Sequence, residues 1–80
     1  MSNPLLVPKI RDLLNRGRKE ELRALFEGAH PRDAADFLSA LEPDLIRRAL
    51  LALPEDKAAE IFSHLEGTIQ AETAQTFERG

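Results

Sequence analysis

The sequence contains no cysteine, tryptophan or tyrosine, and no apolar run approaches the roughly 18 residues of a membrane-spanning helix. Without cysteine the chain forms neither disulfides nor thiolate metal sites, which fits a cytosolic protein. The net charge of -3 and the isoelectric point near 5.3 argue against a nucleic-acid-binding surface. We therefore expect a cytoplasmic segment that does not itself span a membrane and binds no nucleic acid.

Motifs of enzyme active sites are also missing. The sequence has no glycine-rich phosphate loop, no nucleophile elbow and no His-Glu-x-x-His helix. Its two histidines are His30 and His64, and no sequence rule places either beside Ser39 or Ser63. We therefore predict that the chain is not an enzyme and has no catalytic residues.

A repeated helical pattern dominates what is present. Positions i, i+3, i+4 and i+7 fall on one side of a helix, and three successive units are apolar at all four of these positions. A proline opens each unit, at Pro31, Pro43 and Pro54, which suits the first turn of a helix. The three units are Ala34, Phe37, Leu38 and Leu41; Ile46, Ala49, Leu50 and Leu53; and Ala58, Ile61, Phe62 and Leu65.

This spacing predicts separate short helices. On one continuous helix a shift of about 12 residues would rotate the apolar stripe by about 120°, so the units could not share a face. Short helices are marginal alone in water and must bury their stripes against neighbours. We therefore predict an all-α solenoid of about six helices with a repeat of roughly 12 residues. The frame weakens at the last unit, which is Gln70, Thr73, Ala74 and Phe77.

Helix boundaries follow from proline and glycine. We expect the first helix to begin near Pro8 and to end at Asn15, with Gly17 in the left-handed conformation beyond it. The second is expected over residues 18–27, and the sixth from about Ile69. His30 precedes a proline at a helix start, which is typical of a capping or turn residue.

The one basic cluster is Arg16, Arg18 and Lys19. We interpret it as a cationic helix end that complements the helix dipole. A contact with phosphate or a lipid head group is the alternative, although binding of that kind usually uses a longer basic run.

An acidic face is predicted on the fifth helix. Asp56, Glu60 and His64 are spaced i, i+4 and i+8 and share one side, and Glu55 and Asp56 lie near the positive helix N-terminus. Two carboxylates four residues apart repel by about 0.2 to 0.5 kcal/mol, which Lys57 is placed to offset. This face is either solvated surface or half of a weak site for a hard divalent cation such as Mg²⁺.

The sequence resembles the cytosolic N-terminal domain of MgtE-type magnesium channels and transporters from about Ile10 onward. The matching features are a His-Pro-x-Asp opening at His30, a Leu-Pro opening at Leu53, and Lys-Ala-Ala-Glu ending at Glu60. The resemblance implies a right-handed α-helical superhelix as one domain over residues 1–80. Because the CBS domains and the pore of the family are absent, we expect a fragment of a longer protein.

The same resemblance implies a regulatory function. In that family the domain docks on CBS domains of the same polypeptide at high Mg²⁺ and closes the pore of a channel that is usually a homodimer. Glu60 matches a position where family members carry a Mg²⁺-facing carboxylate, and Asp56 is its neighbour by spacing only. The alternative is a stand-alone helical-repeat adaptor that binds a protein partner, similar to the arrays of flagellar motor switch proteins.

Overall fold

The computed structural model describes residues 6–79, and this range contains six α-helices and no strand. The prediction of an all-α fold with about six short helices is confirmed. Residues 1–5 and 80 of the predicted domain lie outside the described part. The helices are α1 (Leu6–Asn15), α2 (Lys19–Glu27), α3 (Pro31–Ser39), α4 (Pro43–Ala52), α5 (Glu55–Ser63) and α6 (Gly67–Arg79).

Prolines start the central helices as their chemistry dictates. Pro31 and Pro43 occupy the first position of α3 and α4, where a missing N–H costs no hydrogen bond. Pro54 is itself the N-cap of α5. The Nδ1 atom of His30 accepts a hydrogen bond from the Arg32 amide at 3.1 Å, which confirms the capping role predicted for this histidine.

Two of the predicted helix starts differ from the structure. Leu6 and Val7, which precede the predicted start near Pro8, are already helical, and residues 1–5 lie outside the described range. The last helix begins at Gly67 rather than Ile69, because the Gln70 amide donates to the Glu66 carbonyl at 2.8 Å and closes an earlier turn. Gly17 has a φ of 69°, which confirms the predicted left-handed position.

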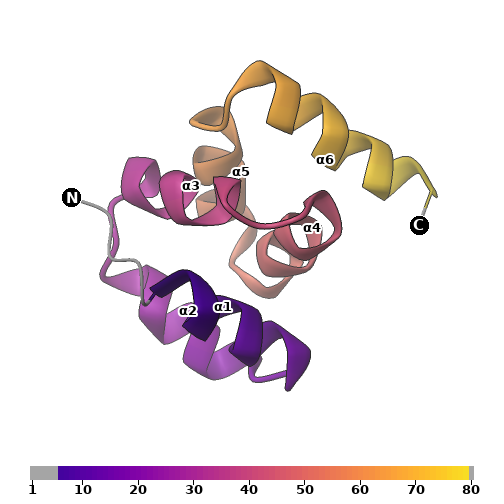
Figure 1. Cartoon of the computed structure of the whole chain (residues 1–80). Helices are drawn as coiled ribbons and strands as arrows, with labels where there is room; N and C mark the ends of the chain where they lie inside the picture. The colour runs from indigo at the N-terminus through magenta and orange to yellow at the C-terminus, as the bar shows by residue number, and fades with distance from the viewer. Residues whose placement is uncertain (1–5, 80) are drawn as a thin grey trace.

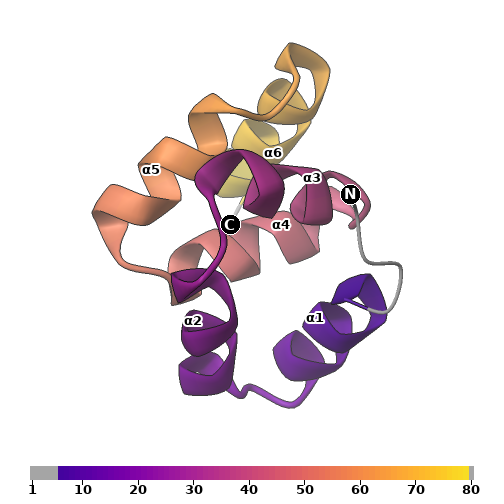
Figure 2. The ribbon, with the colours of Figure 1, turned by 90° about the vertical axis from the view of Figure 1, so that its left-hand side faces the viewer.

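Helix α4 lies at the centre of the bundle and packs against each of the other five helices (Figure 1). Helices α1 and α2 lie side by side at one end, and α6 lies at the other end in both views (Figure 2). Helices two apart in sequence also pack together, α3 on α5 and α4 on α6. The described part measures 27 × 26 × 23 Å, and the right-handed superhelical path stays a prediction.

The predicted apolar stripes form the core. Nine of the twelve positions in the three central units are buried, and the remaining three, Phe37, Ala58 and Phe62, pack partly buried against them. The frame weakens in α6, as the sequence indicates, since Ala74 and Phe77 are exposed. The buried residues of α6 are Thr73 and Thr76, beside the partly buried Ile69.

Long polar side chains join the helices by donating to carbonyl groups at helix C-termini, which otherwise lack partners. Arg48 of α4 donates to the Leu14 carbonyl at 2.7 Å, and Arg23 of α2 donates to the Ala52 carbonyl at 2.9 Å. Gln70 of α6 donates to the Phe62 carbonyl at 2.8 Å. Across residues 6–79, no helix is both long and apolar enough to traverse a lipid bilayer.

Candidate functional site

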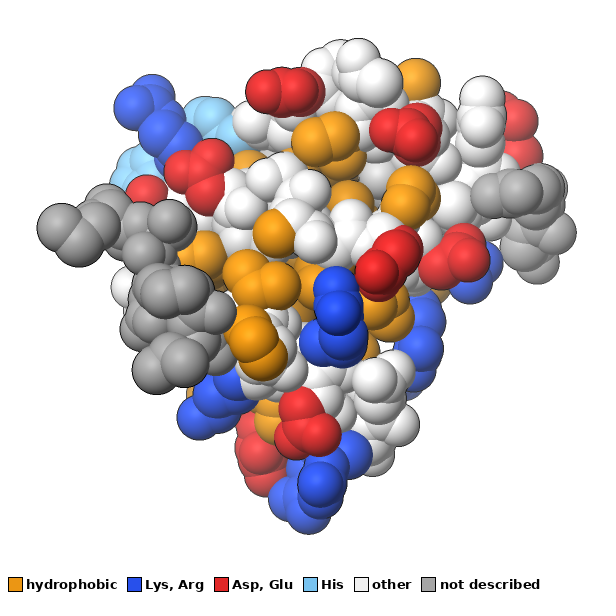
Figure 3. All heavy atoms as spheres, viewed as in Figure 1, with side chains coloured by type: hydrophobic (Ala, Val, Ile, Leu, Met, Phe, Trp, Pro, Cys, Tyr) orange, Lys and Arg blue, Asp and Glu red, His pale blue; other side chains and the backbone are white. Residues whose placement is uncertain are grey.

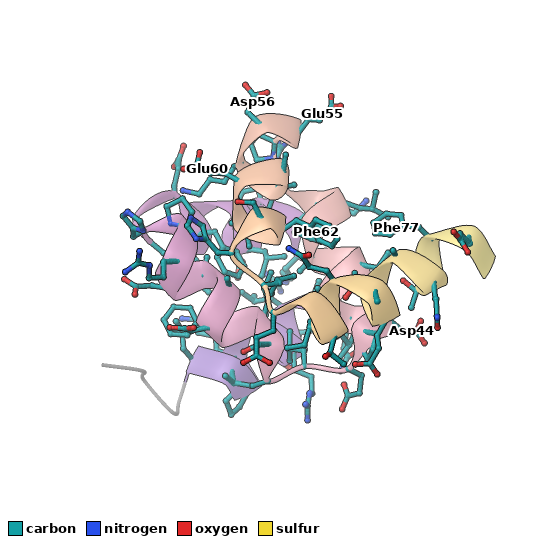
Figure 4. All side chains as sticks on the ribbon, turned by 90° about the horizontal axis from the view of Figure 1, so that it is seen from above. Asp44, Glu55, Asp56, Glu60, Phe62 and Phe77 are labelled. Atoms are coloured by element: carbon teal, nitrogen blue, oxygen red, sulfur yellow. The ribbon has the colours of Figure 1, made fainter. Side chains whose placement is uncertain are left out.

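The candidate site is the exposed acidic side of α5. Pro54 fixes the start of this helix, so that Glu55 and Asp56 occupy its first turn, where the helix dipole stabilises negative charge. Figure 4 shows Asp56 and Glu60 on one side of α5 and Glu55 toward the other side, nearer Phe62 and Phe77. The structure thus places the two predicted ligands on one face, as their spacing requires.

The carboxylates of Asp56 and Glu60 are exposed, and none of the ion pairs found among residues 6–79 involves them. Lys57, which was predicted to offset their repulsion, points elsewhere: its Nζ lies 3.4 Å from the carbonyl oxygens of both Glu27 and Ala29. The ammonium group of Lys57 therefore contacts the α2–α3 junction, and none of the ion pairs found among residues 6–79 joins it to Asp56 or Glu60.

The structure brings the two histidines of the chain together at the C-terminal end of α5. His64 is the C-cap of α5, and its ring centroid lies 6.4 Å from that of His30, the N-cap of α3, with a tilt of 53° between the rings. Sequence reasoning missed this pair because the two residues are 34 positions apart. The packing of α3 on α5 brings them together, and no sequence motif announces that contact.

The donor chemistry fits half of a magnesium site. Hard oxygen donors suit Mg²⁺, which keeps several water ligands and commonly takes only one or two carboxylates from a protein. Among the residues that the structure describes, no three His, Asp or Glu side chains converge closely enough to hold an ion. Asp56 and Glu60 would therefore need further donors from another surface to complete a site.

The basic cluster forms local ion pairs. Arg16 Nε lies 3.0 Å from Asp12 Oδ1, and Arg18 Nη1 lies 2.8 Å from Glu21 Oε1. All four side chains are more than half exposed, so each pair contributes little to stability. Most of the lysine and arginine atoms visible in Figure 3 lie over the lower half of the molecule, where α1 and α2 are.

A family model described as the MgtE intracellular N domain matches residues 29–79, which is more than half of the chain. The matched segment contains α3 to α6 and therefore the whole acidic face. No curated protein and no solved structure matches the chain.

Proposed function

The chain belongs to the MgtE intracellular N domain family, and from this premise we propose that it is the intracellular, Mg²⁺-sensing regulatory domain of a magnesium channel or transporter. The family match over residues 29–79 carries the proposal. The exposed carboxylates of Asp56 and Glu60 support the sensing part, because they lie inside the matched segment and have no cationic partner among the described residues.

The proposed mechanism is charge compensation between two acidic surfaces. At low Mg²⁺, Asp56 and Glu60 repel the carboxylates of the CBS domains of the same polypeptide, so the two parts stay separate. At high Mg²⁺, the same carboxylates share the ion with that partner surface, the domain docks and the pore closes. The ion acts only because it binds the docked arrangement better than the undocked one.

A rough magnitude sets how selective the ion must be for the docked state. Two carboxylates about 6 Å apart repel by about 3 kcal/mol at an effective dielectric constant of 20, and a divalent cation between them replaces this repulsion with attraction to both. Moving a two-state equilibrium from 1:99 to 99:1 takes about 5.5 kcal/mol, so Mg²⁺ must bind the docked arrangement about 10⁴-fold more tightly than the undocked one.

The test uses the full-length protein in liposomes, with ion flux measured as a function of Mg²⁺ on the cytosolic side. We expect Glu60→Gln to raise the Mg²⁺ concentration needed for closure, and Asp56→Asn to raise it less. Glu20→Gln is the matched control, since Glu20 is also exposed but lies on α2, outside the matched segment.

Two results would count against the proposal. Unchanged Mg²⁺ dependence in Glu60→Gln would remove this residue from the sensing role. Failure of the domain to bind the CBS domains at any Mg²⁺ concentration would favour the alternative, a helical-repeat adaptor for another protein.

A further inference from the structure

A small pocket with an apolar floor and a cationic rim lies where the turn between α1 and α2 meets the C-terminal end of α4. Its volume is about 190 Å³. Among the residues that the structure describes, every charged side chain that lines this pocket is basic. We call it the basic pocket, and the lining residues used below are Leu13, Leu22, Leu51, Arg18, Lys19 and Arg48.

The basic pocket lies at a basic end of an acidic molecule. Residues 6–28, which contain α1 and α2, have six basic and four acidic side chains, a net charge of +2. Residues 29–79 have five basic and ten acidic side chains, a net charge of -5. The acidic net charge of the whole chain therefore coexists with one end that attracts anionic groups.

The stability of α2 does not account for the basic residues at its start. Arg18 is the N-cap of α2 and Lys19 is its first residue, so both lie at the positive end of the helix dipole, where cations are unfavourable. Arg18 pairs with Glu21 at 2.8 Å, and Glu21 does not line the pocket. None of the ion pairs found among residues 6–79 involves Lys19, so its charge is available to an anion.

The size of the pocket and the donors on its rim define a ligand. A cavity of about 150 Å³ holds one benzene molecule, so the basic pocket accommodates a single apolar side chain against Leu13 and Leu22. Arg48 Nη2 donates to the Leu14 carbonyl at 2.7 Å, which holds the guanidinium beside the pocket. A guanidinium has five N–H donors, so others remain for a carboxylate.

We infer that the basic pocket binds an acidic protein segment, in which one leucine, methionine or phenylalanine enters the pocket and flanking Asp or Glu residues pair with Arg18, Lys19 and Arg48. Three cations from two elements of the fold select for negative charge, and an acid beside the anchor meets at least one of them. The apolar floor supplies the anchor site that a purely ionic contact would lack.

The basic pocket is distinct from the place where a further helix of the repeat would pack. Helices two apart in sequence contact each other from α1 to α6, so a helix that followed α6 would lie on α5. The pocket is formed by α1, α2 and α4 instead.

Two other occupants fit less well. The acyl chain of a phospholipid is too large for a cavity of this volume, and the net charge of -5 on residues 29–79 opposes approach to an anionic membrane. A second copy could insert its exposed Phe77, which is followed by Glu78. That contact would be head to tail, so it would build open chains unless its rotation closes a ring.

The probe is a short fluorescein-labelled peptide in which one leucine is flanked on each side by two glutamates. Anisotropy at low salt and without Mg²⁺ measures its binding to the chain. We expect it to bind at least about tenfold more tightly than the same peptide with lysine in place of glutamate, and than the peptide with alanine in place of leucine. Binding should weaken as salt is raised, because the charges on the rim are exposed.

Matched variants locate the binding site. Lys19→Glu reverses a charge on the rim, whereas Lys9→Glu makes the same change at an exposed position of α1 that does not line the pocket. We expect Lys19→Glu to weaken binding of the glutamate peptide about fivefold and Lys9→Glu to leave it unchanged. Lys19→Gln should weaken it in the same direction by less, which provides a second variant should the charge reversal disturb folding.

Several outcomes overturn the inference: no binding of the glutamate peptide, equal binding of the lysine or alanine peptide, or equal loss in Lys9→Glu and Lys19→Glu. It is also overturned if the chain sediments as an oligomer that Lys19→Glu dissociates, or if anionic phospholipid vesicles bind at the pocket and displace the peptide. Since no Mg²⁺ is present, the result is independent of the proposed sensing function.

Discussion

Helices α4 and α6 pack against each other but bury opposite kinds of side chain. The buried positions of α4 are entirely apolar, including Ile46 at 1% and Ala49 at 0% exposure, whereas those of α6 are Thr73 and Thr76. Helix α4 is surrounded by the other five helices, and α6 contacts mainly one. A helix with many neighbours buries apolar side chains against several of them, whereas a helix at the edge has one buried side and leaves residues such as Ala74 and Phe77 exposed.

The largest expected difference is in the free energy of unfolding, between a variant that truncates a buried apolar residue of α4 and one that truncates an exposed apolar residue of α6. Ile46→Ala should lower the free energy of unfolding by about 2 to 5 kcal/mol, because it leaves a cavity under α4. A chain of this length has a total of about 4 to 12 kcal/mol. Phe77→Ala should cost about 1 kcal/mol or less, since the ring is 44% exposed. Urea denaturation followed by circular dichroism measures both, because the chain lacks tryptophan and tyrosine.

Equal destabilisation by these two substitutions would contradict the comparison. It would mean that Phe77 is covered in solution and that α6 is rotated relative to α4.

The two buried threonines of α6 test whether an unsatisfied hydroxyl group lowers the stability of this helix. The Oγ1 atom of Thr73 is buried and has no hydrogen-bond partner among the described residues. Thr73→Val keeps the shape and removes the unsatisfied hydroxyl, so it should raise the free energy of unfolding by about 1 to 2 kcal/mol. Thr76→Val is the control, because Thr76 Oγ1 donates to the Thr73 carbonyl at 2.6 Å and its loss should bring no gain.

A gain in Thr76→Val of the same size as in Thr73→Val would show that general hydrophobicity, rather than the missing partner, limits the stability of α6. Urea midpoints of the two single variants and of the double variant distinguish these cases.

Two arginines of α4 contact helices at opposite ends of the bundle, so substituting each one compares the contributions of the two contacts to stability. Arg48 donates to the Leu14 carbonyl of α1 at 2.7 Å, whereas Arg47 reaches the Thr76 carbonyl of α6 at 3.4 Å, and its Nε is buried with no partner in the described chain. Methionine keeps the apolar stem of arginine and removes the donors. Arg48→Met should therefore cost about 1 kcal/mol, and Arg47→Met less. A larger loss of stability in Arg47→Met than in Arg48→Met would show that the contact of α4 with α6 is stronger than its contact with α1.

The smallest effect is expected at the exposed side of α4. Leu51 is 67% exposed, so Leu51→Gln should change the free energy of unfolding by about 0.5 kcal/mol or less. A stability loss comparable to that of Ile46→Ala would place Leu51 in the core.

Sequence pattern predicted the fold where local and tertiary preferences agree. Pro31 and Pro43 set the starts of their helices, Gly17 adopts the left-handed conformation, and residues such as Leu38 and Ile46 are buried as the helical spacing requires. The pattern is weakest at α6, where only Thr73 of the four positions in the frame is buried. A threonine-rich helix has a weak periodicity, so packing against α4 decides which side is buried.

The candidate site likewise has features that the sequence predicts and features that depend on tertiary packing. The shared face of Asp56 and Glu60 follows from helical geometry alone, so it was predictable. The path of Lys57 toward Ala29 and the approach of His64 to His30 depend on how α5 sits on its neighbours. The apolar hollow lined by Leu51, Ala59 and Phe77 depends on the placement of three helices at once. Contacts between distant segments leave little trace in a single sequence.

The central position of α4 also predicts which helices unfold locally most easily. Loosening of α6 uncovers one side of α4, and loosening of α1 uncovers another, but in either case the remaining helices still cover it. Opening of α4 itself requires the loss of contacts with all five, which amounts to global unfolding. Backbone amides of α4 should therefore be the last to exchange with deuterium, and proteases should trim the chain from its ends before they cut near residue 48.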